Sequence, residues 1–363
     1  MRKVVIGTTA ISMAFAVAAC GKAGDDKDDS GSTTGSGGDK SIGLLLPDSV
    51  TTRYAKFDKP YFDAKVKELC ADCKLEYANA AGSAATQAQQ VSSMITKGVK
   101  VIAISAVDSA AIKSSIQAAV DKGIKVVAYD RLAQGPVSAY ISFDNEKVGQ
   151  LQGQSLLDAM GAKATPKAKV VMINGLASDP NAALFKKGAH SVLDGKVDIA
   201  YEQSGDWVDT VAAQKMSAAI TQVGAKNIAG VYSANDGMAG GIATVLKGAG
   251  ISTVPLTGQD AELSSIQRIL AGTQASTIYK AYKPEADGAA ELAVALLEGK
   301  SIDSLASTKM TSGSGDEVPS NLLTPVTLNK DNIEDTVIKD KLYTVAEICT
   351  AEFAAACKTA GLQ

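Results

Sequence analysis

Residues 101–131, VIAISAVDSAAIKSSIQAAVDKGIKVVAYDR, contain the pattern that decides the fold class. Val101–Ile104 and Val126–Ala128 are short runs that are apolar on both faces, and the stretch between them, Ala110–Lys122, is amphipathic with helical spacing. A strand that is apolar on both faces is typical of a parallel sheet covered by helices. The segment therefore predicts a strand–helix–strand unit with parallel strands.

The same alternation continues on both sides of this unit, from Ser41 onward. So many strands would make a very wide single sheet, and two doubly wound sheets with a break near Asn145 are more plausible. The sequence therefore predicts an α/β fold with two lobes. The candidate strands are Ile42–Leu46, Leu75–Ala78, Val101–Ile104, Val126–Ala128, Ala139–Ser142, Val170–Ile173, Val197–Tyr201, Gly230–Ser233, Val254–Thr257 and Ser276–Tyr279.

The first forty residues indicate export and anchoring. Met1–Lys3 is cationic and Val4–Ala19 is apolar but short for a membrane span, which is typical of a signal peptide covering 1–19. The residues Val-Ala-Ala before Cys20 resemble the bacterial lipobox, in which this cysteine carries the lipid; the alternative is an ordinary signal peptide with a chance cysteine. Because 20–40 is almost entirely Gly, Ser, Thr, Asp and Lys, we expect a disordered tether. We therefore expect an exported protein, lipid-anchored to the outer face of the cell membrane or in the periplasm.

Composition disfavours several classes of function. The net charge is −3 and no Lys/Arg-rich run occurs, which argues against binding to nucleic acid or to an anionic membrane surface. The single histidine, His190, argues against His-based metal sites and most acid–base machinery. We expect no metal, no cofactor and no enzymatic activity.

The other four cysteines form two close pairs, Cys70 with Cys73 and Cys349 with Cys357. In an exported protein such pairs are most simply structural disulfides. A thioredoxin-like redox motif or a zinc site remain as alternatives. Cys70 ends a helical pattern, whereas a redox cysteine begins one, where the helix dipole lowers its pKa.

Polar residues follow the predicted strands. Asp130-Arg131, Asp179-Pro180-Asn181, Asn235-Asp236, Gln259-Asp260 and Tyr279-Lys280 are the main examples. Ligands of doubly wound sheets bind at the carboxyl ends of the strands. These residues are therefore candidates for a binding site.

Several of these segments resemble the xylose-binding branch of the periplasmic sugar-binding proteins, and they occur in order over nearly the whole mature chain. The resemblance implies the type I periplasmic-binding-protein fold: two Rossmann-like, doubly wound lobes joined by three hinge crossings, near 144–145, 279–280 and 319–323. It places 41–144 plus 280–321 in an N-terminal lobe and 145–279 plus 322–342 in a C-terminal lobe. The segments are VAYDR at 127–131, YISFDNEKVG at 140–149, SAND at 233–236, GQDAE at 258–262, GTQ at 272–274, YK at 279–280 and LLTP at 322–325.

The resemblance also implies which residues contact a sugar. A sugar ring needs polar partners around its rim and an aromatic plate against its face. Trp207 is the plate, and Tyr54 stands where relatives can have Trp. Nearby cations are expected to keep Asp130, Asp236 and Asp260 ionised, which suits hydroxyl acceptance better than the general-acid role of a glycosidase. The expected ligand-binding set is Arg53, Tyr54, Asp130, Arg131, Asn181, Trp207, Asn235, Asp236, Asp260 and Lys280.

The expected function is therefore capture of a monosaccharide, most simply D-xylose, by a lipoprotein that delivers it to the membrane permease of an ABC transporter. We expect this lipoprotein to be a monomer. Alternatives are a sugar-sensing receptor for a signalling system, or a binder of another pentose or hexose. A sugar-responsive repressor would need an N-terminal DNA-binding motif, where this chain has a signal peptide and tether. The tail, 343–363, extends beyond the usual family end; Val345–Gly361 predicts a helix that must break if Cys349 and Cys357 are bonded.

Overall fold

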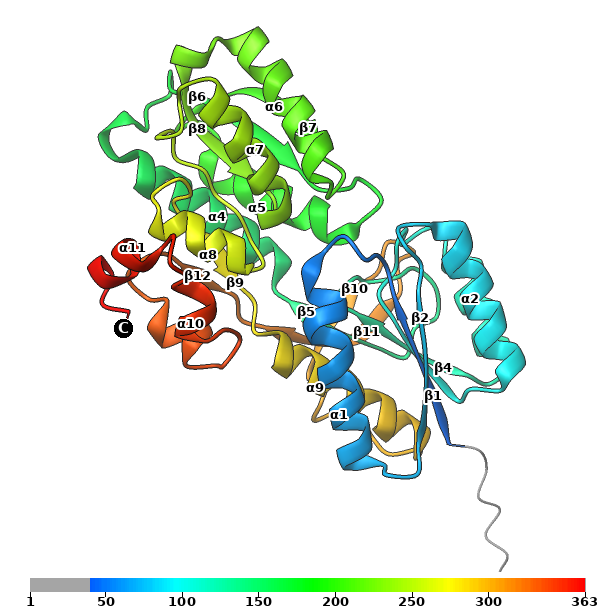
Figure 1. Cartoon of the computed structure of the whole chain (residues 1–363). Helices are drawn as coiled ribbons and strands as arrows, with labels where there is room; N and C mark the ends of the chain where they lie inside the picture. Colours follow the sequence, from blue (N-terminus) through cyan, green and yellow to red (C-terminus); the bar gives the residue numbers. More distant parts are fainter. Residues whose placement is uncertain (1–39, 363) are drawn as a thin grey trace, which may run out of the picture. The chain divides into compact units, whose positions relative to one another are not determined.

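The computed structural model describes residues 40–362. Figure 1 shows two bodies, each with its own sheet and helices. The first sheet has seven strands in the order β10-β11-β5-β4-β3-β1-β2, and all neighbouring pairs are parallel except β10 with β11. Its strands are β1 Ser41–Leu46, β2 Lys74–Asn79, β3 Val101–Ile104, β4 Lys125–Tyr129, β5 Ala139–Phe143, β10 Thr308–Thr311 and β11 Glu317–Leu323.

Helices cover both faces of this sheet, as its doubly apolar strands require. Leu44 faces the side on which α1 (Lys59–Leu69) and α9 (Tyr282–Leu297) pack. Leu45, the next residue, faces the side covered by α2 (Ala84–Lys97) and α3 (Lys113–Asp121). Successive side chains of a strand point to opposite faces, so an uninterrupted apolar run fills two cores. We call this sheet with its four helices the first lobe.

The second lobe is built on a three-stranded parallel sheet in the order β7-β6-β8, beside an antiparallel pair, β9 and β12. The candidate strand Val254–Thr257 forms only an isolated bridge, Val231 with Leu256. Pro255 has no N–H, which limits its pairing. The elements are β6 Lys169–Asn174, β7 Asp198–Ser204, β8 Ile228–Ser233, β9 Thr277–Tyr279, β12 Val326–Leu328, α4 Asn145–Met160, α5 Pro180–Leu193, α6 Asp209–Val223, α7 Asp236–Gly248 and α8 Leu263–Leu270, with short turns at Gly161–Lys163 and Ala225–Asn227.

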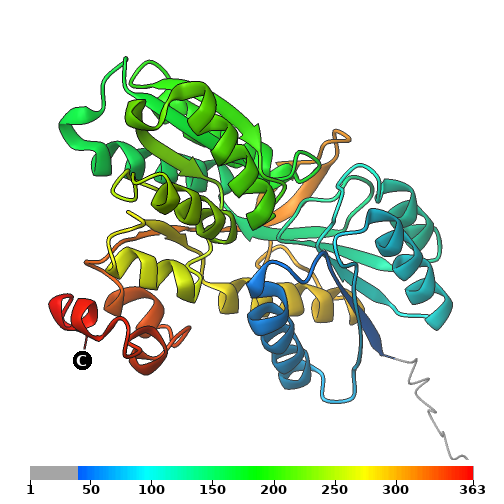
Figure 2. The same cartoon turned by 45° about the horizontal axis from the view of Figure 1, so that its top comes forward.

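The chain passes between the lobes three times. It leaves the first lobe between β5 and α4, returns between β9 and α9, and leaves again between β11 and β12. The third passage lies at 324–325, slightly later than the expected 319–323, because Leu322 and Leu323 still pair with Ser142 and Phe143 in the first sheet. The parallel α/β architecture predicted from the sequence is confirmed. Figure 2 shows the same division from another side.

The C-terminal tail is not one helix. A π-helical turn at Glu334–Ile338 leads to α10 (Val345–Ile348) and α11 (Ala354–Thr359), and the chain bends between them. The bend brings Cys349 to Cys357, and the two form a disulfide. The tail packs on α8 through Ile266 and Ile269 and reaches Phe57 of the first lobe.

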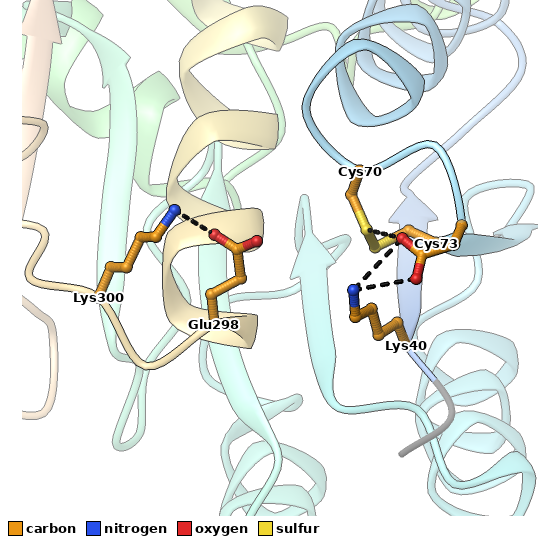
Figure 3. The surroundings of a disulfide bond; sticks show 6 residues. Lys40, Cys70, Cys73, Glu298 and Lys300 are labelled. Carbon is orange, nitrogen blue, oxygen red and sulfur yellow. Dashed lines mark hydrogen bonds and ion pairs between the residues drawn. A yellow bond between two sulfur atoms is a disulfide. The ribbon is translucent and has the colours of Figure 1, made fainter. Parts of the chain in front are cut away.

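The second cysteine pair is also a disulfide. Cys70 ends α1 and is bonded to Cys73, with their Cα atoms 5.3 Å apart. Figure 3 shows Lys40 beside this pair; its Nζ lies 2.9 Å from a carboxylate oxygen of Asp72. Asp72 and the two cysteines are close enough together to resemble a metal site. The two sulfurs form a disulfide, however, and so are not free thiolates that could bind a metal. The predicted disulfide pairing is thus confirmed for both pairs.

The predicted signal peptide, Cys20 and the tether up to residue 39 lie outside the described residues. Within residues 40–362, no helix is both long enough and apolar enough to cross a membrane.

Candidate functional site

A small cavity, partly open to solvent, lies between the two lobes. Nine of the ten residues expected to bind a ligand line it; the exception is Asp236. Residues of both lobes therefore converge on one space. Its lining residues are Thr51, Arg53, Tyr54, Asp130, Arg131, Asp179, Asn181, Phe185, Trp207, Asn235, Gln259, Asp260 and Lys280.

Three of these residues have left-handed backbone conformations although none is glycine. The φ angles are 62° for Asp130, 62° for Trp207 and 101° for Asp260. Asp130 directly follows β4, and Trp207 follows β7 by three residues. Such conformations cost roughly 1–3 kcal/mol each and gather at functional sites, where the surrounding structure maintains them. The sharp turns place these side chains in the cavity wall rather than along the strand direction.

In the first lobe, the Asp130 carboxylate binds two other residues that line the cavity. One of its carboxylate oxygens accepts a hydrogen bond from Nη1 of Arg53 at 3.1 Å, and the other accepts one from the Tyr54 hydroxyl at 2.8 Å. Burial by itself would raise the pKa of this carboxyl, but Arg53, Lys280 and Arg131 outweigh it and hold the pKa below the usual value. Asp130 is therefore an ionised acceptor, as expected from the sequence.

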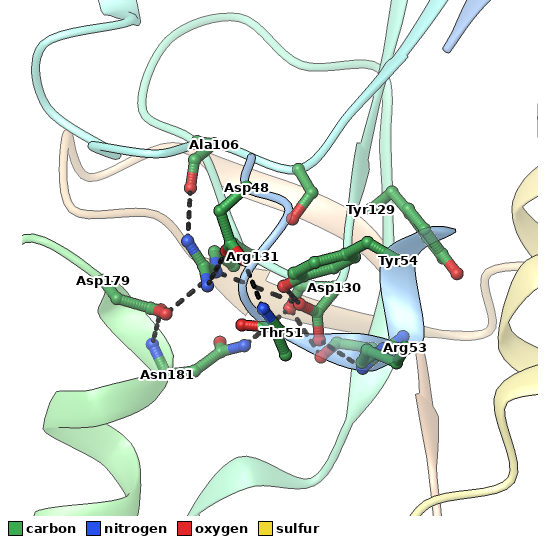
Figure 4. Close-up of polar contacts among 12 residues, drawn as sticks. Asp48, Thr51, Arg53, Tyr54, Ala106, Tyr129, Asp130, Arg131, Asp179 and Asn181 are labelled. Carbon is green, nitrogen blue, oxygen red and sulfur yellow. Dashed lines mark hydrogen bonds and ion pairs between the residues drawn. The ribbon is translucent and has the colours of Figure 1, made fainter. Parts of the chain in front are cut away.

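Arg131 joins the two lobes. Its Nε lies 2.8 Å from Oδ2 of Asp179, the residue that caps α5 in the second lobe. The same oxygen accepts a hydrogen bond from Nε1 of Trp207 at 3.1 Å. Figure 4 shows Asp179 and Asn181 pointing from α5 toward Arg131 and Asp130.

Asn181 makes a second connection between the lobes. Its amide nitrogen donates to the backbone oxygen of Asp130 at 2.9 Å, while its amide oxygen accepts from Asn145 at 2.9 Å. The Ser109 N–H also donates across the gap, to the backbone oxygen of Ser178 at 3.3 Å. The lobes are thus in a closed arrangement.

The rest of the wall comes from the second lobe and a crossing. Nζ of Lys280 lies 2.9 Å from the Asp260 carboxylate, and both side chains are buried. Trp207 lies directly over Gly175, since a Cβ at that glycine would be 2.0 Å from the indole ring. Phe185 meets the Trp207 ring edge-on at 6.3 Å. The wall therefore carries both an ion pair and an aromatic surface.

Asp236 lies elsewhere. It is the first residue of α7, and Asn235, not Asp236, is the N-cap, accepting from the Met238 N–H at 2.9 Å. The Asp236 carboxylate accepts hydrogen bonds from Thr277 at 2.7 Å and Gln274 at 2.8 Å. Burial raises the pKa of Asp236 to about 6 despite Arg268, so this carboxyl is still mostly ionised at pH 7.

Sequence reasoning missed four lining residues: Thr51, Asp179, Phe185 and Gln259. Asp179 and Gln259 belong to polar segments after strands and could have been included on that ground. Phe185, inside the amphipathic helix α5, is indistinguishable in sequence from a core residue.

Chemically, the site combines carboxylates, guanidinium and ammonium groups and amides with aromatic surface. Charged partners form strong, directional hydrogen bonds, and the aromatic rings offer an apolar face. This arrangement fits a small polyhydroxylated ring.

Comparison with known proteins gives a consistent result. Residues 42–301 match the family described as periplasmic binding protein domain. The D-xylose-binding periplasmic protein of Escherichia coli (strain K12) is 38% identical over 315 residues, covering 85% of this chain and 92% of that protein. The multiple sugar-binding periplasmic receptor ChvE of Rhizobium radiobacter is 36% identical over 280 residues, covering 71% of this chain and 78% of that protein.

A solved structure agrees with this. The carbohydrate transporter solute-binding protein of Chloroflexus aurantiacus, in complex with D-glucose, superposes with a TM-score of 0.77 at 28% identity, covering 84% of this chain and 97% of that chain.

Proposed function

Because this chain belongs to the periplasmic binding protein family, we propose that it captures a monosaccharide, D-xylose first among them, and delivers it to the permease of an ABC importer. The observation that carries the proposal is the cavity between the lobes, lined by nine of the ten residues expected to contact a sugar. A ligand that touches both lobes stabilises the closed state over the open one.

The residues of the wall have distinct roles. Asp130 and Asp260 accept hydrogen bonds from sugar hydroxyls, while Arg53, Arg131 and Lys280 donate them. Asn181 and Asn235 can do both through their amides. Trp207, with Tyr54 and Phe185, supplies aromatic surface for the C–H faces of the ring.

A sugar-sensing role is the second candidate. A relative with 36% identity is named a receptor, and sensing would use the same binding chemistry. Genes for a permease and an ATPase beside this one would favour import, and a histidine-kinase gene would favour sensing.

Export and anchoring belong to the same proposal. Cys20 would carry the lipid after removal of residues 1–19, leaving a monomeric binding domain tethered to the cell surface. Labelling cells with a radioactive fatty acid tests this: the wild-type protein should be labelled and a Cys20→Ala variant should not. Labelling of both proteins, or of neither, would rule out a lipid anchor at Cys20.

We further propose that the site binds without catalysis, because Asp130 is held ionised and so is a poor general acid. Nitrophenyl glycosides should remain intact in its presence.

Calorimetric titration of the protein with D-xylose, L-arabinose, D-ribose, D-glucose and D-galactose tests the central claim. We expect the tightest binding for D-xylose and weaker binding for sugars with an added or inverted hydroxyl, since one unsatisfied polar partner costs on the order of 1–3 kcal/mol. No heat with any of the five would exclude the proposal. Tighter binding of another sugar would keep the function and change the ligand.

A further inference from the structure

Two completely buried carboxylates, Asp58 and Glu285, lie behind the cavity without lining it. Both contact the guanidinium of Arg53, which does line it. Arg53 thus connects the ligand space to a pair of acidic groups that the ligand does not reach.

The contacts occupy most of the donors of Arg53. Nε and Nη2 donate to the two oxygens of Asp58 at 2.8 and 2.7 Å. Nη2 also donates to Oε2 of Glu285, and Nη1 donates to Asp130 at 3.1 Å. The Tyr282 ring stacks against the guanidinium, with its centroid 4.5 Å from the central carbon. A guanidinium has five N–H groups, so one on Nη1 remains after these four hydrogen bonds.

Glu285 differs from Asp58 in origin. Asp58 lies five residues from Arg53 in the same local segment, whereas Glu285 belongs to α9, which begins just after the second crossing. Ala286 and Ala289 of the same helix are fully buried in the first lobe's core, so α9 is a rigid base for its side chain. The contact therefore ties the local segment of Arg53 to a distant, firmly packed helix.

The Glu285 carboxyl is buried in surroundings that do not satisfy it fully. Its other oxygen, Oε1, is buried and lacks a hydrogen-bond partner among the described residues. Burial raises the pKa of Glu285 to about 8; Asp130 and Asp58 act in the same direction, while Arg53 and Lys280 oppose them. A buried carboxyl with an unpartnered oxygen destabilises the folded protein. Its presence at this position therefore indicates a role other than packing.

We infer that Glu285 is a positioning residue for Arg53: without touching the ligand, it fixes the guanidinium so that its remaining N–H serves the sugar. The inference rests on the proposed function. Asp58 holds the guanidinium at Nε and Nη2, and Asp130 holds it at Nη1 from the cavity side; Glu285 adds a further fixed point at Nη2, from behind the cavity. Loss of this point should weaken binding without removing any group from the cavity wall.

The experiment is a double-mutant cycle on sugar affinity, measured by calorimetry with D-xylose up to millimolar concentrations. We expect Glu285→Ala to weaken binding about tenfold, and to add no further loss in an Arg53→Ala background, because its effect passes through Arg53. Equal losses in both backgrounds, or unchanged affinity of a folded Glu285→Ala variant, would overturn the inference. If Glu285→Ala does not fold, Glu285→Met fills a similar volume without an acceptor and takes its place.

Two controls separate positioning from general damage. Glu285→Gln restores an acceptor oxygen and should recover most of the affinity; a Gln variant as weak as the Ala variant would contradict the role. Glu291→Ala, a substitution at a partly exposed residue of the same helix, should bind like wild type.

A crystal structure of the unliganded Glu285→Ala variant gives an answer that does not depend on any sugar. We expect the Arg53–Asp130 contact to be lost or disordered, and an unchanged contact would overturn the inference. If the wild-type protein bound none of the five sugars, the proposed function would fail while this structural test still decided the role of Glu285.

Discussion

Nε of Arg131 lies 2.8 Å from Oδ2 of Asp179, and these two buried side chains belong to different lobes. The ion pair links the lobes in the wall of the cavity, and Asp179 also accepts a hydrogen bond from the Trp207 indole N–H. One carboxylate therefore joins lobe closure to the orientation of the aromatic surface.

Asp179→Asn should weaken sugar binding by roughly ten- to hundredfold. The substitution removes the nearest carboxylate from buried Arg131, and breaking a buried charge pair typically costs about 2–5 kcal/mol. Because Asp48 and Asp130 remain 3.8 and 4.0 Å from Arg131, we expect a loss at or below the lower end of that range. Calorimetry measures the affinity, and small-angle scattering should show a more open average shape in the presence of subsaturating sugar. Asp198→Asn, at an exposed position of the second lobe, is the matched control. Wild-type affinity in Asp179→Asn would show that the pair contributes nothing to closure.

Trp207 is the only tryptophan in the chain, so its fluorescence reports on the site alone. We expect the emission of the wild-type protein to change on addition of D-xylose, and Trp207→Ala to lose at least tenfold in affinity, because the ring supplies apolar contact area. Trp207→Phe keeps an aromatic plate but not the bond to Asp179, and its affinity should be intermediate. Equal binding by all three proteins would exclude a stacking role.

Sugar affinity should decrease as the pH rises from 5.5 to 8. Burial raises the pKa of Glu262 to about 8; Asp236 and Asp260 add to the effect, and Arg268 and a hydrogen bond from Thr52 of the other lobe oppose it. If opening exposes Glu262 to water and returns its pKa toward the usual value, closure takes up a proton. A carboxyl with a raised pKa in the closed state stabilises that state below its ordinary pKa and loses this contribution as the pH rises toward 8.

If closure takes up one proton, sugar affinity can change by no more than about tenfold per pH unit. Titrations at pH 5.5, 6.5, 7.5 and 8.5 measure this change, and Glu262→Gln should flatten the profile. A wild-type profile that is flat, or rises with pH, would contradict the prediction.

Removal of the Cys349–Cys357 disulfide should loosen the tail while leaving the lobes folded. The bridge closes a short loop, for which the chain-entropy model gives about 2–3 kcal/mol. Replacing both cysteines by serine should therefore expose the tail to limited proteolysis. Without the bridge, α10 and α11 are held by the packing of residues such as Ile348, Phe353 and Leu362 and by hydrogen bonds from Gln267 to the backbone of α10. The Cys70–Cys73 pair replaced in the same way is the control, and it should leave tail cleavage unchanged. Equal protease resistance of wild type and the tail variant would contradict a stapling role.

The sequence contained enough to predict much of the fold because its strands are apolar on both faces. Leu44 and Leu45 fill opposite cores, and no other arrangement buries such runs as well. Local signals also fix helix ends: α2 begins at Ala84 and ends at Lys97, since Ser83 caps it and Gly98 ends it in a left-handed conformation. By contrast, Val254–Thr257 has the composition of a strand but contains a proline, and it pairs at one residue only.

The site was less predictable than the fold. Position after a strand identified Asp130 and Asp260, but it could not distinguish Asn235 from Asp236, which are adjacent and both compatible with a helix start. The left-handed backbones at Asp130 and Trp207 depend on the tertiary surroundings, not on residue type. Phe185 and Glu285 look like ordinary helix residues until the lobes are assembled.

The threading of the chain through three crossings also sets an order of assembly. Helices α4 to α8 and strands β6 to β8 come from one continuous stretch, 145–270, so most of the second lobe can collapse as soon as that stretch is available. The first lobe must wait, because Ala286, Ala289 and Ala293 belong to its core and β11 completes one side of β5. When the chain is made from its N-terminus, about a hundred residues of the first lobe therefore cannot complete their domain until roughly residue 323 has been synthesised. Truncations before β11 should therefore yield half-folded, protease-sensitive protein.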